Sequence, residues 1–399
     1  MMSGFATGAI WREQLNSLRS SGGYKDAVEL EGPQGPHVRM NGRDVLNLSS
    51  NNYLGLANDP RVVEAAKQGL SVYGAGTASV RFICGTMSCH RELETKIAEF
   101  IGCEAALTYM SCWDANIGLI PTLANTTDDA IFSDSLNHAS IIDAIRLSKA
   151  SRHIFQHQDM DDLESKLRSA TCKGVRLIVT DGVFSMEGDI ARLVRLRDLA
   201  DAYGALLIID ESHATGVLGE RGRGTAEHFG VLGEGTVQTS TLGKTLGGAC
   251  GGYVAGTRVI CDYLLQKSRP HLFSNALPPS VCCGAIAAID ILMEEPDRLA
   301  QLRSNTGYFR EKMGALGFHI PPSITPIVPV IVGETALAIN MQKALLHDRG
   351  AFVSGFGYPV VPEGAARLRC QISSAHSRED LDAAVSAFRS IGEKFGVIA

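Results

Sequence analysis

The sequence lacks any uninterrupted apolar run of the roughly 18 residues that a membrane-spanning helix needs, so no such span is expected. It has no basic N-terminal segment followed by an apolar core, so no signal peptide is predicted. There is no excess of positive charge: the net charge of -6 argues against binding to nucleic acid. Hydrophobic residues, by contrast, make up 45% of the 399 residues, which is enough for a sizeable core.

Disulfide and metal patterns are also missing, although ten cysteines are present. No CxxC pair occurs, Cys282 and Cys283 are adjacent, and the other cysteines are scattered. The metal-binding pattern HExxH is absent. We therefore expect reduced thiols, no metal site and a cytoplasmic protein.

Apolar strand-like runs alternate with helical patterns from about residue 46 to about residue 290. The runs occupy 105–110, 129–134, 176–181, 205–210, 237–242 and 251–256. This alternation predicts an α/β fold with a large, mainly parallel sheet covered by helices on both faces.

The last hundred residues predict a smaller α/β domain. A long helical stretch over 280–317 leads to strands at 326–332 and 367–373 and to helices at 335–349 and 378–395. We divide the chain into an N-terminal helix and arm (1–45), a large domain that holds the site (46–290) and a small C-terminal domain (291–399).

Polar residues end several of the predicted strands, namely Asp134, Asp181, Asp210 and Thr241. In open α/β sheets, ligands bind at the carboxyl ends of the strands. The sequence therefore predicts a ligand site at this edge of the large sheet.

Asp210 ends the strongly apolar run ALLIID, and His213 follows three residues later. A buried carboxylate requires a cationic partner. One interpretation is an N-capping aspartate beside a surface histidine. The other is that Asp210 pairs with the protonated pyridine nitrogen of pyridoxal 5'-phosphate (PLP), which keeps the ring an electron sink.

A lysine, Lys244, lies among glycines in STLGKTLGGACGGY. Lysine forms Schiff bases with carbonyl groups, and glycine lets a cofactor approach the backbone. A phosphate-binding P-loop is excluded, because its first glycine would stand where Gln238 stands. Asp210, His213 and Lys244 together predict a PLP enzyme with the cofactor on Lys244.

A chain of further motifs accompanies these residues in order. They are NNYLGLANDP (51–60), GTASVRFICGT (76–86), SCWDAN (111–116), DSLNHASIID (134–143), TDGVFSMEG (180–188), DESHATG (210–216), TLGKTLGG (241–248), RPHLFSN (269–275) and SSAHS (373–377). Over nearly its whole length the chain resembles the α-oxoamine synthases, PLP enzymes that condense an amino acid with an acyl-CoA. It is most similar to their glycine C-acetyltransferase (2-amino-3-ketobutyrate CoA ligase) branch. The resemblance implies PLP fold type I, the aspartate aminotransferase-like fold.

The resemblance implies roles around the cofactor ring. Lys244 would carry PLP and take the substrate's α-proton, and Asp210 would pair with the pyridinium. His213 and Ser185 would hydrogen-bond the 3'-oxygen, and His138 would stack on the ring. The alternative for His138 is a purely structural helix cap.

The resemblance also implies a phosphate site. Ser111, Cys112 and Trp113 precede a predicted helix, whose backbone N–H groups and dipole favour a dianion. Thr241 would add a hydroxyl, and Ser274 would come from the neighbouring subunit of a homodimer. The alternative for Ser274 is a turn residue.

Asn51 and Arg369 match the positions that bind the amino-acid carboxylate, and the fork of an arginine suits such a group. We expect Arg367, in the same strand, to point to the opposite face. Arg81 resembles a residue of the acyl-CoA entry region.

The implied reaction joins glycine and acetyl-CoA to give 2-amino-3-oxobutanoate and CoA, as in threonine catabolism. Three alternatives stay open: another amino acid or a longer acyl-CoA, a PLP aldolase or aminotransferase, and an inactive partner subunit. The presence of Lys244 disfavours the last of these.

Overall fold

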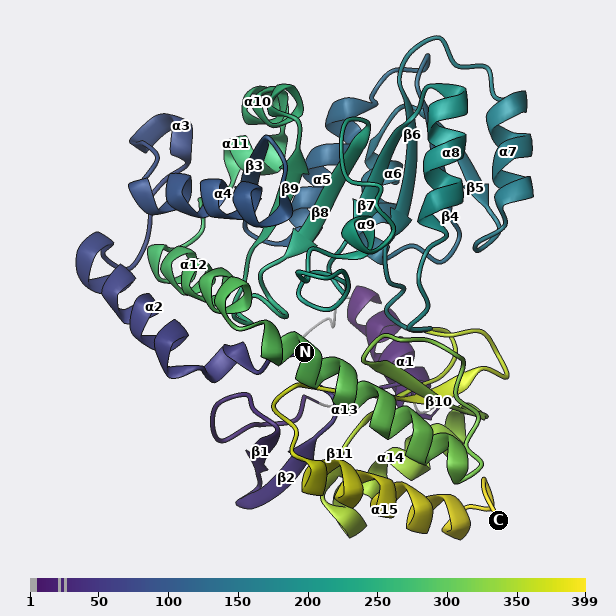
Figure 1. Cartoon of the computed structure of the whole chain (residues 1–399). Helices are drawn as coiled ribbons and strands as arrows, with labels where there is room; N and C mark the ends of the chain where they lie inside the picture. Colours follow the sequence, from purple (N-terminus) through teal and green to yellow (C-terminus); the bar gives the residue numbers. More distant parts are fainter. Residues whose placement is uncertain (1–5, 21–22, 25–26) are drawn as a thin grey trace.

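The computed structural model describes residues 6–20, 23–24 and 27–399, and the remainder of the predicted N-terminal helix and arm lies outside the described residues. The chain builds an upper part around a large sheet and a lower part around two small sheets (Figure 1). Helix α1 (Ala6–Ser20) confirms the predicted N-terminal helix.

The large sheet has seven strands and is mainly parallel, as predicted. In spatial order they are β3 (Ala105–Tyr109), β9 (Gly252–Gly256), β8 (Thr236–Thr241), β7 (Leu206–Asp210), β6 (Arg176–Asp181), β4 (Ala130–Asp134) and β5 (Ser151–Phe155). Only β9 runs antiparallel to its neighbours. The edge strand β5 was not predicted, because its first three residues, Ser151, Arg152 and His153, are polar and leave no apolar run.

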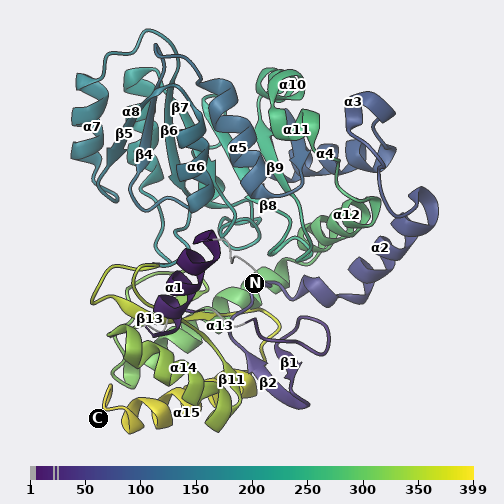
Figure 2. The same ribbon diagram turned by 180° about the vertical axis from the view of Figure 1, so that it is seen from behind.

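Helices cover both faces of this sheet (Figures 1 and 2). On one face lie α4 (Ser88–Ile101), α7 (Met160–Ser169) and α8 (Leu193–Tyr203), and on the other α5 (Cys112–Leu123), α6 (Ala139–Leu147) and α10 (Arg258–Lys267). Four short helices complete the upper part: η1 (Leu56–Asn58), α3 (Arg81–Cys84), α9 (Thr225–His228) and α11 (Arg269–Phe273).

The long helical stretch predicted over 280–317 is two helices, α12 (Pro279–Glu294) and α13 (Pro296–Ala315). Pro296 has no N–H to continue the first helix, and it disfavours helical geometry in the preceding residue. Glu295 accordingly has φ -116° and ψ 70°. Helix α12 lies against α2 (Pro60–Tyr73), where a Cβ on Gly69 would stand 2.9 Å from the carbonyl oxygen of Pro279.

The smaller C-terminal α/β domain is confirmed. Strands β10 (Ile327–Gly333), β13 (Ala366–Gln371) and β12 (Ser354–Phe356) form an antiparallel sheet, beside α14 (Thr335–Arg349) and α15 (Arg378–Lys394).

The hairpin of β1 (His37–Met40) and β2 (Arg43–Asn47) pairs with this domain through β11 (Ala351–Phe352). Its turn, Asn41-Gly42, has positive φ at both residues, as a tight hairpin requires. The hairpin therefore spans the predicted boundary at residue 45 and packs with the C-terminal part. The domain boundaries themselves stay predictions.

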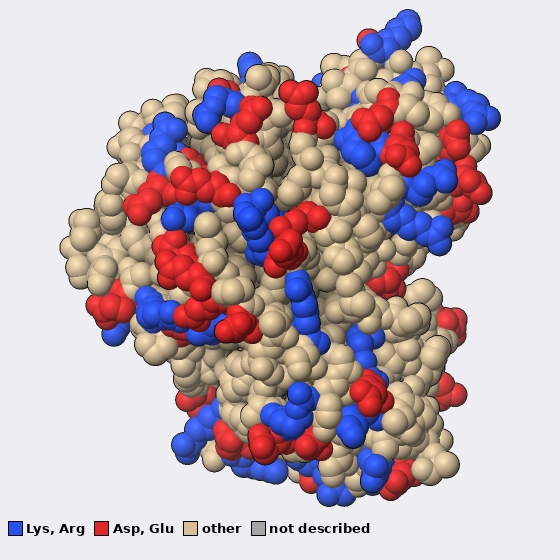
Figure 3. Space-filling model, in the orientation of Figure 1, with Lys and Arg blue, Asp and Glu red and all other residues tan. Residues whose placement is uncertain are grey.

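Acidic and basic side chains are interspersed over the face in Figure 3. Among the described residues, no helix combines the length and the apolar character that crossing a membrane requires.

Candidate active site

A cavity of about 220 Å³ opens at the carboxyl ends of the parallel strands, where the polar strand ends predicted a site. It is lined by Ser111, Cys112, Trp113, His138, Ser140, Asp181, Val183, Ser185, Asp210, Ser212, His213, Thr241 and Lys244. Every predicted cofactor-binding residue except Ser274 is among them.

Asp210 is buried at the end of β7, and its carboxylate is held from two sides. It accepts hydrogen bonds from Asn116 Nδ2 at 2.8 Å and from the backbone N–H of Ser212 at 2.9 Å. The nearest following helix begins at Thr225, so Asp210 is not a helix N-cap. Asn116 on α5 was missed, because an amide inside the motif SCWDAN carries no chemical signal of its own.

His213 is buried rather than on the surface. Its Nδ1 lies 2.8 Å from the hydroxyl of Tyr53, which also donates to Gln371 Oε1 at 3.2 Å. Burial lowers the pKa of His213 well below its usual value, and the positive charges of Lys244 and Arg369 lower it further. The imidazole is therefore neutral and fixed in orientation. Tyr53 lies far away in the sequence and was missed for that reason.

Lys244 stands in the loop after β8. Loss of hydration lowers the pKa of its amine to about 8, against the opposing effect of Asp210. An amine with this pKa is partly neutral near pH 7 and is thus a better nucleophile than an ordinary lysine.

The glycines near Lys244 also serve the packing of the chain. A Cβ on Gly243 would lie 2.7 Å from the carbonyl oxygen of Ala249. At Gly252, a Cβ would lie 2.3 Å from the backbone nitrogen of Cys112. Glycine at these positions lets β9 and the lysine loop close against the start of α5.

Ser111 is the N-cap of α5 and accepts a hydrogen bond from the backbone N–H of Asp114 at 3.0 Å. Cys112 and Trp113, in the first turn of α5, line the cavity, and the backbone N–H groups of such a turn are suited to a dianion. The hydroxyl of Thr241 donates to the carbonyl of Gly251 at 3.1 Å.

His138 is a helix cap and a cavity residue at once. Its Nδ1 accepts from the backbone N–H of Ser140 at 3.2 Å at the start of α6, and the cap holds the ring at the cavity. Its backbone N–H donates to Asp181 Oδ2 at 3.0 Å. Burial raises the pKa of Asp181 well above its usual value, and the nearby charge of Asp210 raises it further.

Arg369 reaches the cavity wall, where Nη1 donates to the carbonyl of Ser185 at 2.9 Å. Arg367 donates to the carbonyl of Met186 at 2.9 Å and pairs with Glu187 at 3.2 Å. The expectation of opposite faces was wrong, because side chains on a strand repeat every second residue and these two share a face.

The other two predicted substrate residues differ in position. Asn51 contacts the Tyr53 hydroxyl at 3.5 Å and so lies beside the site. Arg81 does not line the cavity: its guanidinium is buried and Nη2 donates to Glu94 Oε2 at 3.0 Å. This ion pair occupies the donors that the predicted acyl-CoA contact would need.

The cavity residues fit PLP. The buried carboxylate of Asp210 suits a cationic ring nitrogen, Lys244 offers an amine of lowered pKa, and the start of α5 offers N–H groups to a phosphate. These are the groups that the cofactor's three polar ends require.

Comparisons with known proteins agree with this arrangement. The family model described as "Aminotransferase class I and II" matches residues 43–388. The mitochondrial 2-amino-3-ketobutyrate coenzyme A ligase of Bos taurus is 49% identical over 391 residues, which cover 98% of this chain and 93% of the relative. The 8-amino-7-oxononanoate synthase of Symbiobacterium thermophilum is 48% identical over 387 residues, 97% of this chain and 98% of the relative.

A solved structure is similar over the whole fold. It is a variant of serine palmitoyltransferase from S. paucimobilis with a bound PLP–myriocin aldimine, with a TM-score of 0.92, 31% identity and coverage of 97% of this chain and 98% of that chain. The chain belongs to the aminotransferase class I and II family, as a PLP-dependent acyltransferase of the α-oxoamine synthase group.

Proposed function

We propose that this protein is a glycine C-acetyltransferase, which condenses glycine with acetyl-CoA to 2-amino-3-oxobutanoate and CoA. The observation that carries the proposal is the 49% identity, over 98% of the chain, to a 2-amino-3-ketobutyrate coenzyme A ligase. The cavity adds the chemical groups that the reaction uses.

Bound PLP supplies an electron sink for the negative charge that develops at the α-carbon of the amino acid. Lys244 would hold the cofactor covalently, and Asp210, which is oriented by Asn116, would bind the ring N–H. The backbone N–H groups at the start of α5, beside Ser111, would hold the phosphate, and Thr241 would give it the hydroxyl proton that now goes to the Gly251 carbonyl.

The remaining residues act on the substrate. Lys244, with a pKa of about 8, takes the α-proton once its amine is released. The α-carbon then forms a bond to the thioester carbon of acetyl-CoA, and CoA leaves as the thiolate. Neutral His213 and Ser185 would contact the ring oxygen of the bound cofactor, and Arg369 and Asn51 would bind the carboxylate of the amino acid.

The proposal includes a homodimer. Ser274 is exposed, lies outside its own cavity and follows Phe273, whose side chain is 65% exposed. A second copy would cover this apolar side chain and receive Ser274 at its phosphate site. Threonine catabolism and a cytoplasmic location stay predictions from the sequence.

The test is a CoA-thiol assay on PLP-loaded protein with acetyl-CoA and glycine, L-alanine, L-serine or L-glutamate. Thiol release with glycine alone supports the proposal. Release with another amino acid only would replace the substrate, and no release at all, with amino-group transfer or threonine cleavage instead, would replace the reaction class.

A second substrate pair is favoured by the 48% identity to an 8-amino-7-oxononanoate synthase. In that case the chain would prefer L-alanine and a longer acyl-CoA. Running the same assay with both amino acids and with short and long acyl-CoA separates the two candidates by their kcat/KM.

A further inference from the structure

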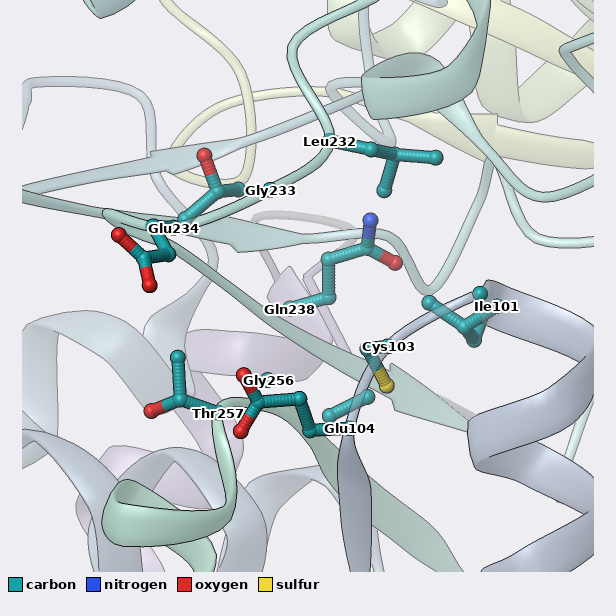
Figure 4. Close-up of a pocket in the computed structure, with 12 residues that line it drawn as sticks. Ile101, Cys103, Glu104, Leu232, Gly233, Glu234, Gln238, Gly256 and Thr257 are labelled. Carbon is teal, nitrogen blue, oxygen red and sulfur yellow. The ribbon is translucent and has the colours of Figure 1, made fainter.

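A second cavity, of about 230 Å³, lies at the amino end of strand β8 (Figure 4). The candidate active site lies at the carboxyl end of the same strand. Its walls come from the end of α4, the start of β3, the loop before β8 and the end of β9. They are formed by Ile101, Gly102, Cys103, Glu104, Leu232, Gly233, Glu234, Thr236, Gln238, Ala255, Gly256 and Thr257.

Gln238 is the polar residue at the centre of this cavity. Its side chain rises from β8 and its amide end points toward Leu232 (Figure 4). The residue is only 2% exposed, yet neither Nε2 nor Oε1 has a hydrogen-bond partner in the structure. A buried amide without partners costs free energy, so this group calls for an explanation.

The neighbouring polar residues of β8 are satisfied. Thr236 donates to the carbonyl of Val231 at 2.9 Å, and Thr239 donates to Asn116 Oδ1 at 2.8 Å. The strand therefore does not tolerate unpaired groups in general. The unpaired donor and acceptor belong to the buried amide of Gln238, a residue that lines the cavity.

The rest of the lining limits what can bind. Ile101, Leu232 and Ala255 supply an apolar wall. Glu104 and Glu234 add carboxylates, and Glu104 Oε2 already accepts from the backbone N–H of Arg258 at 2.9 Å. Two carboxylates repel phosphates and other anions. The lining residues thus suit a neutral or cationic molecule with an apolar face.

We propose that this cavity binds a small heterocycle with an N–H donor next to an acceptor, such as the edge of an adenine ring. The amide of Gln238 reads that edge with two hydrogen bonds, one given by Nε2 and one accepted by Oε1. The heterocycle carries no phosphate. The site is separate from the candidate active site, whose Thr241 lies at the other end of β8.

The test measures binding of adenine, adenosine and AMP to the PLP-loaded protein by isothermal titration calorimetry. We expect adenine and adenosine to bind, and AMP to bind about tenfold more weakly because of the two carboxylates. Gln238→Leu keeps the volume and removes the amide, and should weaken adenine binding about tenfold or more. Glu234→Gln is the matched control. It should bind adenine as the unaltered protein does, and the difference in affinity between adenosine and AMP should become smaller.

A ligand-side control needs no variant. N6,N6-dimethyladenine keeps the ring and loses the donor, so it should bind the unaltered protein about tenfold more weakly than adenine. The proposal is wrong if none of the probes binds, in which case water alone occupies the cavity. It is equally wrong if dimethyladenine binds as well as adenine, or if Gln238→Leu binds adenine unchanged.

Discussion

The two ends of strand β8 carry cavities of nearly equal size, about 220 Å³ at the carboxyl end and about 230 Å³ at the amino end, but their polar groups differ. At the carboxyl end, Asp210 accepts from Asn116, and His213 contacts Tyr53. At the amino end, the amide of Gln238 has no partner. Side chains that are hydrogen-bonded to each other have a fixed orientation before a ligand binds. The amide of Gln238, by contrast, gains hydrogen bonds only from a molecule that binds in the cavity.

The largest effect that separates the two ends is expected from Lys244→Ala. The variant loses both the covalent attachment of PLP and the base, and a positioned base alone contributes about 10²–10⁴-fold to the rate. CoA-thiol release should fall by at least that factor, and the visible absorbance band of lysine-bound PLP should disappear. Lys67→Ala, on the exposed face of α2, should change neither. A Lys244→Ala protein that keeps the band and the thiol release would remove the carboxyl end from consideration as the active site.

Asp210→Asn should have the next largest effect. The exchange leaves the ring nitrogen without its buried counter-charge, and it places an amide next to the amide of Asn116. Loss of one partner from a buried ion pair costs about 3–5 kcal/mol. PLP affinity, measured by fluorescence titration of the apo-protein, should fall about 10²-fold or more.

Asp134→Asn provides the matched control for that exchange. Asp134 also ends a strand of the large sheet, but its carboxylate pairs with His157 at 2.9 Å and does not line the cavity. The PLP affinity of Asp134→Asn should stay within a few-fold of the affinity of the unaltered protein. Equal losses in both variants would mean that strand-end carboxylates stabilise the sheet and do not bind the cofactor.

The carboxyl end could be predicted from sequence because its residues recur in ordered motifs. Asp210, His213 and Lys244 stand at spacings that carry chemical meaning, and all three line the cavity. The residues that orient these three side chains could not be predicted. Tyr53 meets His213 only through the fold.

Gln238 shows the other limit of the sequence. From the sequence, Gln238 could be used only to exclude a P-loop. Nothing in the sequence indicates that this strand residue lines a cavity. The face of Arg367 was predicted wrongly for a simpler reason: residues two apart on a strand share a face, and both Arg367 and Arg369 contact the loop at 185–187.

The pH dependence of PLP capture tests the charge state at the carboxyl end. The reactive form of Lys244 is the neutral amine, and its pKa is about 8 because it is shielded from water. The second-order rate constant of PLP binding to the apo-protein should increase about tenfold for each unit by which the pH is raised toward 8, and it should level off above pH 8. A rise that continues to pH 10 would show that the amine has the pKa of an ordinary lysine.

Tyr53→Phe should have a moderate effect. Without the hydroxyl, the ring of His213 loses its orienting contact, and kcat should fall about tenfold, or about 1.4 kcal/mol. The absorbance maximum of bound PLP should shift as well, since we propose that His213 contacts the ring oxygen. Tyr253→Phe, whose hydroxyl meets Thr215 at 3.4 Å away from the cavity lining, should change stability without that shift. An unchanged spectrum in Tyr53→Phe would restrict Tyr53 to a structural role.

The smallest effect gives the most direct comparison, because it concerns two adjacent residues of β8. Thr239→Val removes a buried hydroxyl that donates to Asn116, and leaves the acceptor unpaired, so it should destabilise the protein by about 1–3 kcal/mol. Gln238→Leu removes an amide that has no partner, so without ligand it should leave stability unchanged or raise it by up to about 2 kcal/mol. Urea unfolding monitored by tryptophan fluorescence measures both. If Gln238→Leu destabilises the protein as much as Thr239→Val does, then the amide is paired in solution, by ordered water, and the amino end is as self-contained as the carboxyl end.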